Sequence, residues 1–191
     1  MKAEFVKSAV HPDQFPVDGL PEIAFLGRSN VGKSSLLNCL VGSSGLAFTS
    51  SKPGCTQVIN FFRVDGGFTF VDLPGYGYAR VPLDIKAQWK RLVEQYLLHR
   101  EALSTCFLIL DARRGWMEKD LELKNWLEVH GRRYLVIATK TDKLKTQKER
   151  AHSMAAIRGR TDTDPLPFSA IQCQGAREIW QAIRTIKKND Q

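Results

Sequence analysis

Gly27-Arg28-Ser29-Asn30-Val31-Gly32-Lys33-Ser34 is the stretch that decides the fold of this chain. It fits the pattern G-x-x-x-x-G-K-[ST] of a phosphate-binding loop, and it stands between an apolar run at 22–26 and a predicted helix at 35–41. The glycines let backbone N–H groups turn toward the β- and γ-phosphates, and the helix N-terminus adds the positive end of its dipole. Lys33 would reach the β/γ oxygens, and the Ser34 hydroxyl would bind Mg²⁺. The sequence therefore predicts a nucleotide-binding protein.

Length and composition favour one domain. A chain of 191 residues suits a single nucleotide-binding domain over 1–191, and two complete domains would be cramped. No apolar run approaches about 20 residues and the N-terminus lacks the apolar core of a signal peptide, so we expect a cytoplasmic protein without membrane association. The four cysteines are scattered, without a C-x-x-C pair. Cys39 and Cys106 lie in apolar stretches, so we interpret them as core thiols and expect neither a zinc site nor a disulfide framework.

The net charge of +8 is placed unevenly along the chain. Residues 1–76 contain six Lys or Arg and six Asp or Glu, whereas residues 77–191 contain 22 against 14, so the second part carries the whole excess. A basic half beside a site for an anionic nucleotide suggests a second polyanion, and we favour RNA over DNA. A solvated basic surface without a partner is the alternative. The candidate contacts are Arg113, Arg114, Arg132, Arg133, Lys187 and Lys188.

Apolar runs and helical periodicities alternate along the chain. Residues 1–21 form an extended lead-in that could add an edge strand at 6–10, a Gly-, Ser- and Thr-rich loop occupies 42–56, and the turn Asp65-Gly66-Gly67 indicates a hairpin. We predict strands at 22–26, 57–64, 68–71, 105–110, 134–138 and 166–168, helices at 35–41, 83–98, 117–129, 146–157 and from Gly175 onward, and a basic tail at 187–191. This alternation indicates an α/β fold: a three-layer, doubly wound, mostly parallel sheet with one antiparallel edge strand.

Four motifs follow predicted strands, each at a C-terminal strand end. They are the phosphate-binding loop at 27–34, Asp72-Leu73-Pro74-Gly75, Thr139-Lys140-Thr141-Asp142, and the pair Ser169-Ala170 after Phe168. Ligands of open α/β sheets bind at these strand ends, so all four would meet at one nucleotide. A carboxylate before a tight Pro-Gly turn is where a P-loop protein holds Mg²⁺ and senses the γ-phosphate, which predicts Asp72 as a metal residue, directly or through water.

The four motifs together resemble the translation-factor-like class of P-loop GTPases over nearly the whole chain. The resemblance implies that 139–142 is the guanine-reading motif N/T-K-x-D, in which the Asp142 carboxylate accepts hydrogen bonds from guanine N1–H and its 2-amino group, a pair that adenine lacks. Thr139 stands where Asn is commoner, the Lys140 stem would lie along the base, and a backbone N–H at Ser169-Ala170 would meet guanine O6. Thr56 would be the first-switch threonine that binds Mg²⁺ together with Ser34. The expected nucleotide contacts are Gly27, Arg28, Ser29, Asn30, Val31, Gly32, Lys33, Ser34, Ser35, Thr56, Asp72, Leu73, Pro74, Gly75, Thr139, Lys140, Thr141, Asp142, Phe168, Ser169 and Ala170.

The details narrow this resemblance further. Gly-Arg-Ser-Asn-Val-Gly-Lys-Ser, Lys-Pro-Gly-Cys-Thr-Gln, Asp-Leu-Pro-Gly-Tyr-Gly-Tyr-Ala and Thr-Lys-Thr-Asp, in one small domain, are similar to the EngB (YihA/YsxC) family of bacterial GTPases. The resemblance implies a molecular switch that hydrolyses GTP to GDP, acts in assembly of the large ribosomal subunit and is needed for normal cell division and septation. It implies Mg²⁺ as cofactor, and the large subunit or its precursor as partner through rRNA and ribosomal proteins. We expect a monomer.

The expected chemistry is phosphoryl transfer, which depends mainly on positioning and on neutralising charge at the γ-phosphate. We expect the catalytic residues for this reaction to be Lys33, Thr56, Gly75 and Asn30. Ras-like relatives place a water-orienting glutamine just after the D-x-x-G motif, whereas this chain has Tyr76, so we expect slow intrinsic turnover. In related GTPases an asparagine at the position of Asn30 helps to hold K⁺ against the phosphates. The alternative is an asparagine that only hydrogen-bonds the loop.

Other classes of protein are weaker alternatives. An RNA-binding module with a structural nucleotide is one, although Lys33, Ser34, Thr56 and Asp72 together argue against a dead site. An ATPase or small-molecule kinase would need an arginine-bearing lid and a base, neither of which we can place, and Asp142 favours guanine. A lipid-anchored GTPase would need a C-terminal cysteine or a glycine in the position of Lys2.

Overall fold

The computed structural model describes residues 3–42, 58–65, 67–76 and 83–189, with 83–86, 89 and 187–189 described through their backbone alone. Within these ranges one seven-stranded sheet has the order β1-β3-β4-β2-β5-β6-β7. The strands are β1 (Ala3–Ala9), β2 (Glu22–Gly27), β3 (Ile59–Val64), β4 (Phe68–Asp72), β5 (Leu103–Asp111), β6 (Tyr134–Thr139) and β7 (Leu166–Pro167). All neighbouring pairs are parallel except the two that involve β3. The predicted fold class is confirmed.

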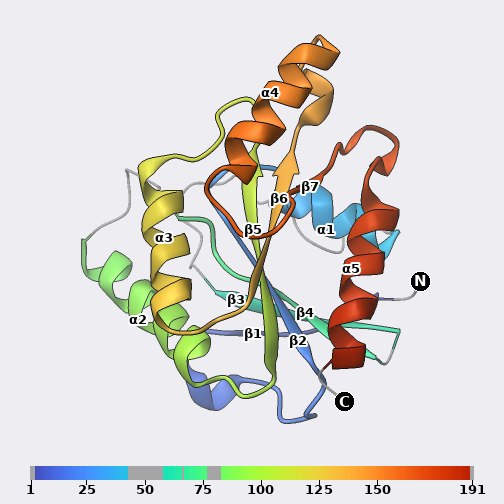
Figure 1. The fold of residues 1–191 in the computed structure, drawn as a ribbon. Helices are drawn as coiled ribbons and strands as arrows, with labels where there is room; N and C mark the ends of the chain where they lie inside the picture. Colours follow the sequence, from blue (N-terminus) through green and yellow to red (C-terminus); the bar gives the residue numbers. More distant parts are fainter. Residues whose placement is uncertain (1–2, 43–57, 66, 77–82, 190–191) are drawn as a thin grey trace.

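Helices cover both faces of the sheet and complete three layers (Figure 1). The longer ones are α1 (Lys33–Val41), α2 (Leu83–His99), α3 (Glu118–Val129), α4 (Gln147–Arg158) and α5 (Ala176–Asn189). α1 and α5 lie against one face, and α2 and α3 lie against the other. Short 3₁₀ turns occur at η1 (Pro12–Gln14), η2 (Thr141–Lys143) and η3 (Ile171–Cys173). In the part of the chain described, no helix is both long enough and apolar enough to cross a membrane.

The first and last elements that the structure describes extend beyond their predicted ranges. The lead-in forms β1, which pairs with β3 and is the outermost strand, so the antiparallel strand β3 is second from that edge. At the other end α5 continues to Asn189, so the prediction of a tail from 187 is wrong for 187–189. Ile179 and Ile183 are fully buried at helical spacing, and the sequence has no Gly or Pro between them and Asn189 to stop the helix.

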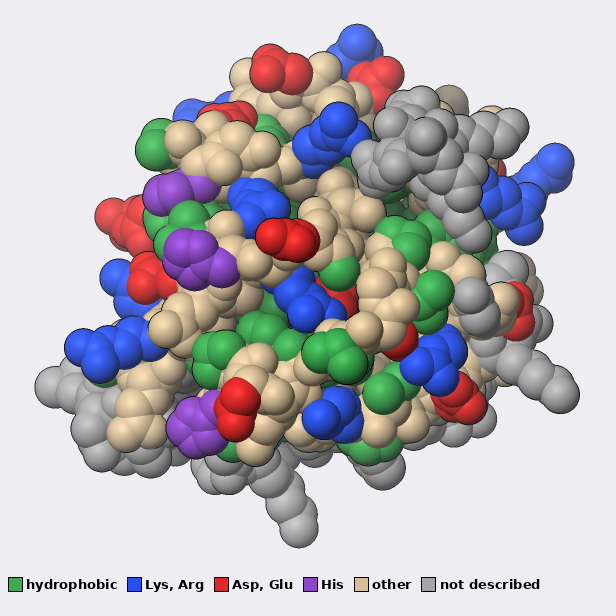
Figure 2. All heavy atoms as spheres, turned by 90° about the horizontal axis from the view of Figure 1, so that it is seen from below, with side chains coloured by type: hydrophobic (Ala, Val, Ile, Leu, Met, Phe, Trp, Pro, Cys, Tyr) green, Lys and Arg blue, Asp and Glu red, His purple; other side chains and the backbone are tan. Residues whose placement is uncertain are grey.

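Figure 2 shows the end of the molecule at which β2 and β5 begin, opposite to the strand ends that carry the four motifs. Lys and Arg side chains on this face are interspersed with Asp and Glu and do not gather into one basic patch. Among the residues coloured in this view, positive charge is therefore not concentrated in one place.

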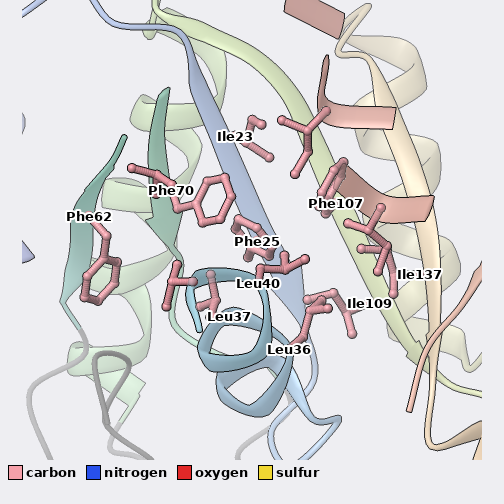
Figure 3. Packing of buried hydrophobic residues seen from close by; sticks show 14 of the residues in the cluster. Ile23, Phe25, Leu36, Leu37, Leu40, Phe62, Phe70, Phe107, Ile109 and Ile137 are labelled. Carbon is pink, nitrogen blue, oxygen red and sulfur yellow. The ribbon is translucent and has the colours of Figure 1, made fainter. Parts of the chain in front are cut away.

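The core on the α1 side fixes the helix that follows the phosphate-binding loop (Figure 3). Leu36, Leu37 and Leu40 point from α1 toward the sheet, and each is at most 2% exposed. Phe25 lies at the centre, with its ring edge-on to Phe70 and Phe107 at centroid distances of 5.0 and 5.3 Å. Each buried leucine or phenylalanine contributes about 1.5–3 kcal/mol of transfer free energy. The packing therefore holds the start of α1 rigidly at the end of β2.

The cysteines differ from expectation in one respect. Cys106 is a buried free thiol in β5, as predicted, and burial raises its pKa to about 12. Cys39 instead forms a disulfide with Cys173, so our interpretation of Cys39 as a core thiol, and of the chain as free of disulfides, is wrong. α1 packs beside η3 and brings the two Cα atoms to 5.5 Å, although 134 residues separate them in sequence. Sequence spacing alone gave no sign of this pairing.

Candidate nucleotide-binding site

The loop between β2 and α1 has the backbone that its glycines permit. Gly32 has φ of 106° and Asn30 has φ of 61°, both in the left-handed region. A Cβ on Gly27 would lie 2.8 Å from Cγ1 of Val31 and 3.2 Å from Cβ of Ile109, so the loop folds back too closely for any side chain there. This bend places Lys33, the first residue of α1, and Ser34 at the mouth of the loop.

Lys33 forms an ion pair with Asp72, the last residue of β4. The two side chains are only 11% and 14% exposed. β4 lies parallel to β2, with Asp72 in register with Phe25, and this pairing brings the second motif beside the first. The lysine expected on the phosphates and the carboxylate expected at Mg²⁺ are therefore in direct contact.

The segment after Asp72 lies on the phosphate-binding loop. The Ser29 amide donates to the Tyr76 carbonyl at 3.1 Å, and the Tyr76 amide donates to the Gly27 carbonyl at 3.2 Å. A Cβ on Gly75 would lie 3.1 Å from the Ser29 nitrogen, which is tighter than nine in ten real contacts. A larger residue at this position would have to push the two loops apart by a few tenths of an ångström.

Tyr76 is fixed through its side chain as well. Its hydroxyl donates to Oδ1 of Asp120, on the first turn of α3, at 2.7 Å. Asp120 is 2% exposed, and burial raises the pKa of its carboxyl. Burial, followed by the charge of Asp120, raises the pKa of the Tyr76 phenol. The sequence gave no sign of this pair.

Thr139 and Lys140 tie the third motif to the phosphate-binding loop. The Thr139 hydroxyl lies 2.6 Å from the Val31 carbonyl oxygen and 2.9 Å from that of Leu110. Lys140 Nζ donates to the Asn30 carbonyl at 2.6 Å. A threonine in the position where asparagine is commoner thus still links the two motifs.

Asp111 at the end of β5 completes this region. It accepts from Arg113 Nε and Nη2 at 2.9 and 2.6 Å and from Lys140 Nζ at 3.0 Å. Burial opposes ionisation of this carboxyl, but the hydrogen bonds from Arg113 and Lys140 prevail and hold its pKa at about 2. Arg113, predicted as an RNA contact, is therefore paired with Asp111 in this structure. A strand-ending aspartate two residues before an arginine was the available signal for this pair.

Asp142 is aligned by the fourth motif. Ser169 Oγ donates to Oδ1 of Asp142 at 2.7 Å, and this bond is the main cause of the lowered pKa of that carboxyl. Thr141 donates its hydroxyl to the Phe168 carbonyl at 3.1 Å. Ala170 follows at the start of η3. The carboxylate expected to read guanine is thus held in one orientation by a serine from the next strand end.

The structure brings the four motifs together at one end of the sheet. Direct bonds or close contacts join 27–34 to 72–76 and to 139–142, and 139–142 to 168–170. Thr56 lies outside the described residues. Arg28 contacts Met117 through its guanidinium. Beside the phosphate-binding loop a cavity of about 290 Å³ is lined by Arg28, Asn30, Asp111, Arg114, Asp120 and Lys140, among others.

The donor set at this site suits Mg²⁺. Ser34 offers a hydroxyl and Asp72 a carboxylate, which are the hard oxygen ligands that this ion takes. Within the described ranges no cluster of three or more His, Cys, Asp or Glu could hold a metal by itself. Mg²⁺ usually binds through one or two protein groups together with substrate phosphates, so the residues present fit this ion.

Fold and site together define a P-loop GTPase. Residues 22–140 match the family model of the 50S ribosome-binding GTPase. The probable GTP-binding protein EngB of Solibacter usitatus is 64% identical over 97% of this chain and 96% of its own length, and that of Trichlorobacter lovleyi is 50% identical over 97% and 96%. The chain belongs to the EngB family of GTP-binding proteins, GTP-hydrolysing enzymes with a ribosome-related role.

Solved structures share the fold. A crystal structure of a probable GTP-binding protein engB superposes with a TM-score of 0.70 at 23% identity, covering 88% of this chain and 99% of that one. The crystal structure of Era in complex with MgGDPNP and nucleotides 1506-1542 of 16S ribosomal RNA superposes with a TM-score of 0.69 at 24% identity, covering 88% of this chain and 56% of that one. At these identities the likeness concerns the fold alone.

Proposed function

We propose that this chain is a GTP-dependent switch that acts in assembly of the large ribosomal subunit, and that normal cell division and septation depend on it. The observation that carries the proposal is the direct bonding of the guanine-reading motif to the phosphate-binding loop, through Thr139 to Val31 and Lys140 to Asn30. Base recognition and phosphate binding then form one rigid site. The family description as 50S ribosome-binding supports the choice of partner.

The phosphates would bind at the N-terminus of α1. Backbone N–H groups of 28–34 and the dipole of α1 would face the phosphate oxygens, and Lys33 would exchange its contact with Asp72 for one with the β/γ oxygens. Ser34, Asp72 and Thr56 would hold Mg²⁺, which when bound neutralises charge on the phosphates. Gly75 would sense the γ-phosphate through its N–H.

The base would lie between 139–142 and Ser169-Ala170. Ser169 holds one oxygen of Asp142, so the carboxylate is pre-aligned for guanine N1–H and the 2-amino group. The Lys140 stem would cover the ring. A base without these two donors would leave the carboxylate without its partners, which makes the site selective.

Turnover is expected to be slow without an activator. The Tyr76 hydroxyl is bonded to Asp120, and no water-orienting glutamine stands at this position. Asn30 has an exposed side chain on the loop and would help to hold K⁺ against the phosphates. We expect kcat to be higher in K⁺ than in Na⁺ at matched ionic strength. Equal rates in the two salts would contradict this role for Asn30.

Binding of the ribosome or its precursor would use the basic second half of the chain, in a cytoplasmic monomer. Arg114 lines the cavity beside the phosphate-binding loop and is exposed. Arg113 forms a salt bridge with Asp111, which neutralises its charge. Arg114 is therefore the stronger candidate of the two for contact with rRNA phosphates. Contact near this loop would couple binding of the partner to the state of the nucleotide.

The test is co-sedimentation with purified large ribosomal subunits at several salt concentrations. We expect association with a non-hydrolysable GTP analogue, much weaker association with GDP, and loss of the difference in Asp142→Asn. Salt-sensitive RNA binding that is equal in GTP analogue and GDP would contradict the switch and favour the alternative, an RNA-binding module with a structural nucleotide.

A further inference from the structure

We propose that Asp120 is a positioning residue for GTP hydrolysis: by accepting the Tyr76 hydrogen bond it holds Gly75 against the phosphate-binding loop, so that the site distinguishes GTP from GDP. Tyr76 OH lies 2.7 Å from Oδ1 of Asp120. The inference rests on the proposed role of Gly75 as the glycine that senses the γ-phosphate. It adds α3, which carries none of the four motifs, to the groups that set the chemistry.

The carboxylate of Asp120 is buried with neutral donors alone among its hydrogen-bond partners in the described structure. Oδ1 accepts from the Tyr76 phenol, and Oδ2 accepts from the Met117 amide at 3.0 Å. The side chain is 2% exposed, and the positive charge that acts on it is that of the Arg28 guanidinium, which is itself bonded to Met117 Sδ. A buried carboxylate without a bonded cation is costly, so its presence needs a reason.

Capping of α3 does not supply that reason. The bond from Met117 N to Asp120 caps the start of α3. The start of α4 is capped in the same way by Glu149, which accepts from the Thr146 amide, and Thr146 and Glu149 are both exposed to solvent. A helix start in this protein can therefore be capped by an acidic residue without burying it. The bond to Tyr76 distinguishes Asp120 from Glu149.

The backbone of Tyr76 connects Gly75 with the phosphate-binding loop. Its amide and carbonyl are bonded to Gly27 and Ser29, at 3.2 and 3.1 Å. Gly75 packs so closely on Ser29 that an added Cβ would be 3.1 Å from the Ser29 nitrogen. Tyr76 is therefore held at its backbone by the phosphate-binding loop and at its hydroxyl by Asp120, directly after Gly75. Small displacements of a group that meets the transferred phosphate have large effects on rate.

The experiment compares wild type with Tyr76→Phe, which removes only the hydroxyl, and with Asp120→Ala. Three quantities are measured: the Kd for GDP, the Kd for a non-hydrolysable GTP analogue, and kcat. We expect Tyr76→Phe to raise the Kd for the GTP analogue about tenfold and to lower kcat, with the Kd for GDP unchanged. Both variants break the Tyr76–Asp120 bond, and Asp120→Ala also removes the bond from the Met117 amide. The double variant should therefore lose no more than Asp120→Ala alone.

Tyr134→Phe is the matched control. Tyr134 OH donates to Oε1 of Glu128 at 2.6 Å, so this variant also removes a tyrosine–carboxylate bond to α3, at the other end of that helix. We expect it to leave both Kd values and kcat unchanged.

An unchanged ratio of the two Kd values in Tyr76→Phe would overturn the positioning role. If both Kd values rise by the same factor, the ratio is also unchanged, and the hydroxyl then has a structural role only. The proposed function would fail separately, if the wild-type protein associated with the large subunit equally in the presence of the GTP analogue and of GDP. The ratio of the two Kd values in Tyr76→Phe would still test the positioning role.

Discussion

One hydroxyl, that of Thr139, connects the base-reading motif with the phosphate-binding loop. It is 1% exposed and lies 2.6 Å from the Val31 carbonyl oxygen. A buried carbonyl that loses its donor costs about 1–3 kcal/mol. The third motif therefore depends on this residue for stability as well as for position.

Replacement of this threonine should affect both properties. We expect Thr139→Ala to lower the free energy of unfolding by about 1–3 kcal/mol and to weaken GDP binding, because the tether to Val31 is lost. Thr139→Ser keeps the hydroxyl and should retain most of both. Urea denaturation and calorimetric titration with GDP give the two values. Full affinity in Thr139→Ala would show that the tether is dispensable for binding.

Asp111 should make stability depend on pH in the acid range. Its pKa lies at about 2 in the folded protein against 3.8 for an ordinary aspartate, so the folded state favours the ionised form. The stabilisation is complete above about pH 5 and is lost as the pH falls toward 2. The difference corresponds to about 2 kcal/mol. We expect the gap in unfolding free energy between wild type and Asp111→Asn to narrow between pH 4 and pH 2, as measured by urea denaturation. A constant gap would contradict the assignment.

Single residues were predictable where a motif fixes their neighbours. The residues at 27–34, 72–75 and 139–142 could be placed because the chemistry of phosphate and base recognition constrains their order and spacing. Asp120 could not be placed. An aspartate on the first turn of an amphipathic helix ordinarily faces water, and its partner Tyr76 is 44 residues away.

At the scale of elements, the disulfide joins α1 to η3, and so joins the helix below the phosphates to the turn after Ser169-Ala170. It closes a loop of 134 residues, for which the chain-entropy model gives about 5 kcal/mol at most. We expect dithiothreitol to lower the Tm of the oxidised wild type. Cys39→Ser should melt at the temperature of the reduced protein, with or without reductant.

The matched control for this prediction is Cys106→Ser, because Cys106 is a buried free thiol. It should keep the response to dithiothreitol, whatever its own Tm. A wild-type Tm that does not respond to reductant after complete oxidation, verified by thiol titration, would contradict a stabilising role for the Cys39–Cys173 bond.

Most elements were predictable from periodicity. The apolar runs that became β2, β5 and β6 are buried on both faces, which is why their central residues, 23–26, 106–110 and 135–138, are all apolar. Helix α2 agrees with its predicted range within one residue. The outermost strand β1 and the last turns of α5 were harder to predict, because they are stabilised by neighbours that are distant in sequence. β1 pairs with β3, and α5 packs on α1 and the sheet.

At the scale of the whole molecule, the two ends of the sheet differ in the side chains that they carry. One end gathers the four motifs and the adjoining cavity. The opposite end carries mixed charges without a basic patch (Figure 2). Net charge and family predict a polyanionic partner, and we propose Arg114, which is exposed beside the phosphate-binding loop, as a contact for it. The sequence could not supply this placement, because it depends on which end of the sheet each loop reaches.

The central claim is that this is a guanine-specific switch, and the measurement that tests it most directly is equilibrium binding of fluorescent GDP and GTP analogues competed with ATP. We expect wild type to ignore a large excess of ATP, and Asp142→Asn to lose guanine affinity by at least about 100-fold. Asp164→Asn, which changes an exposed aspartate paired only with Arg158 among its described salt bridges, should behave as wild type. Displacement of the guanine analogues by ATP at equal concentration would contradict the assignment.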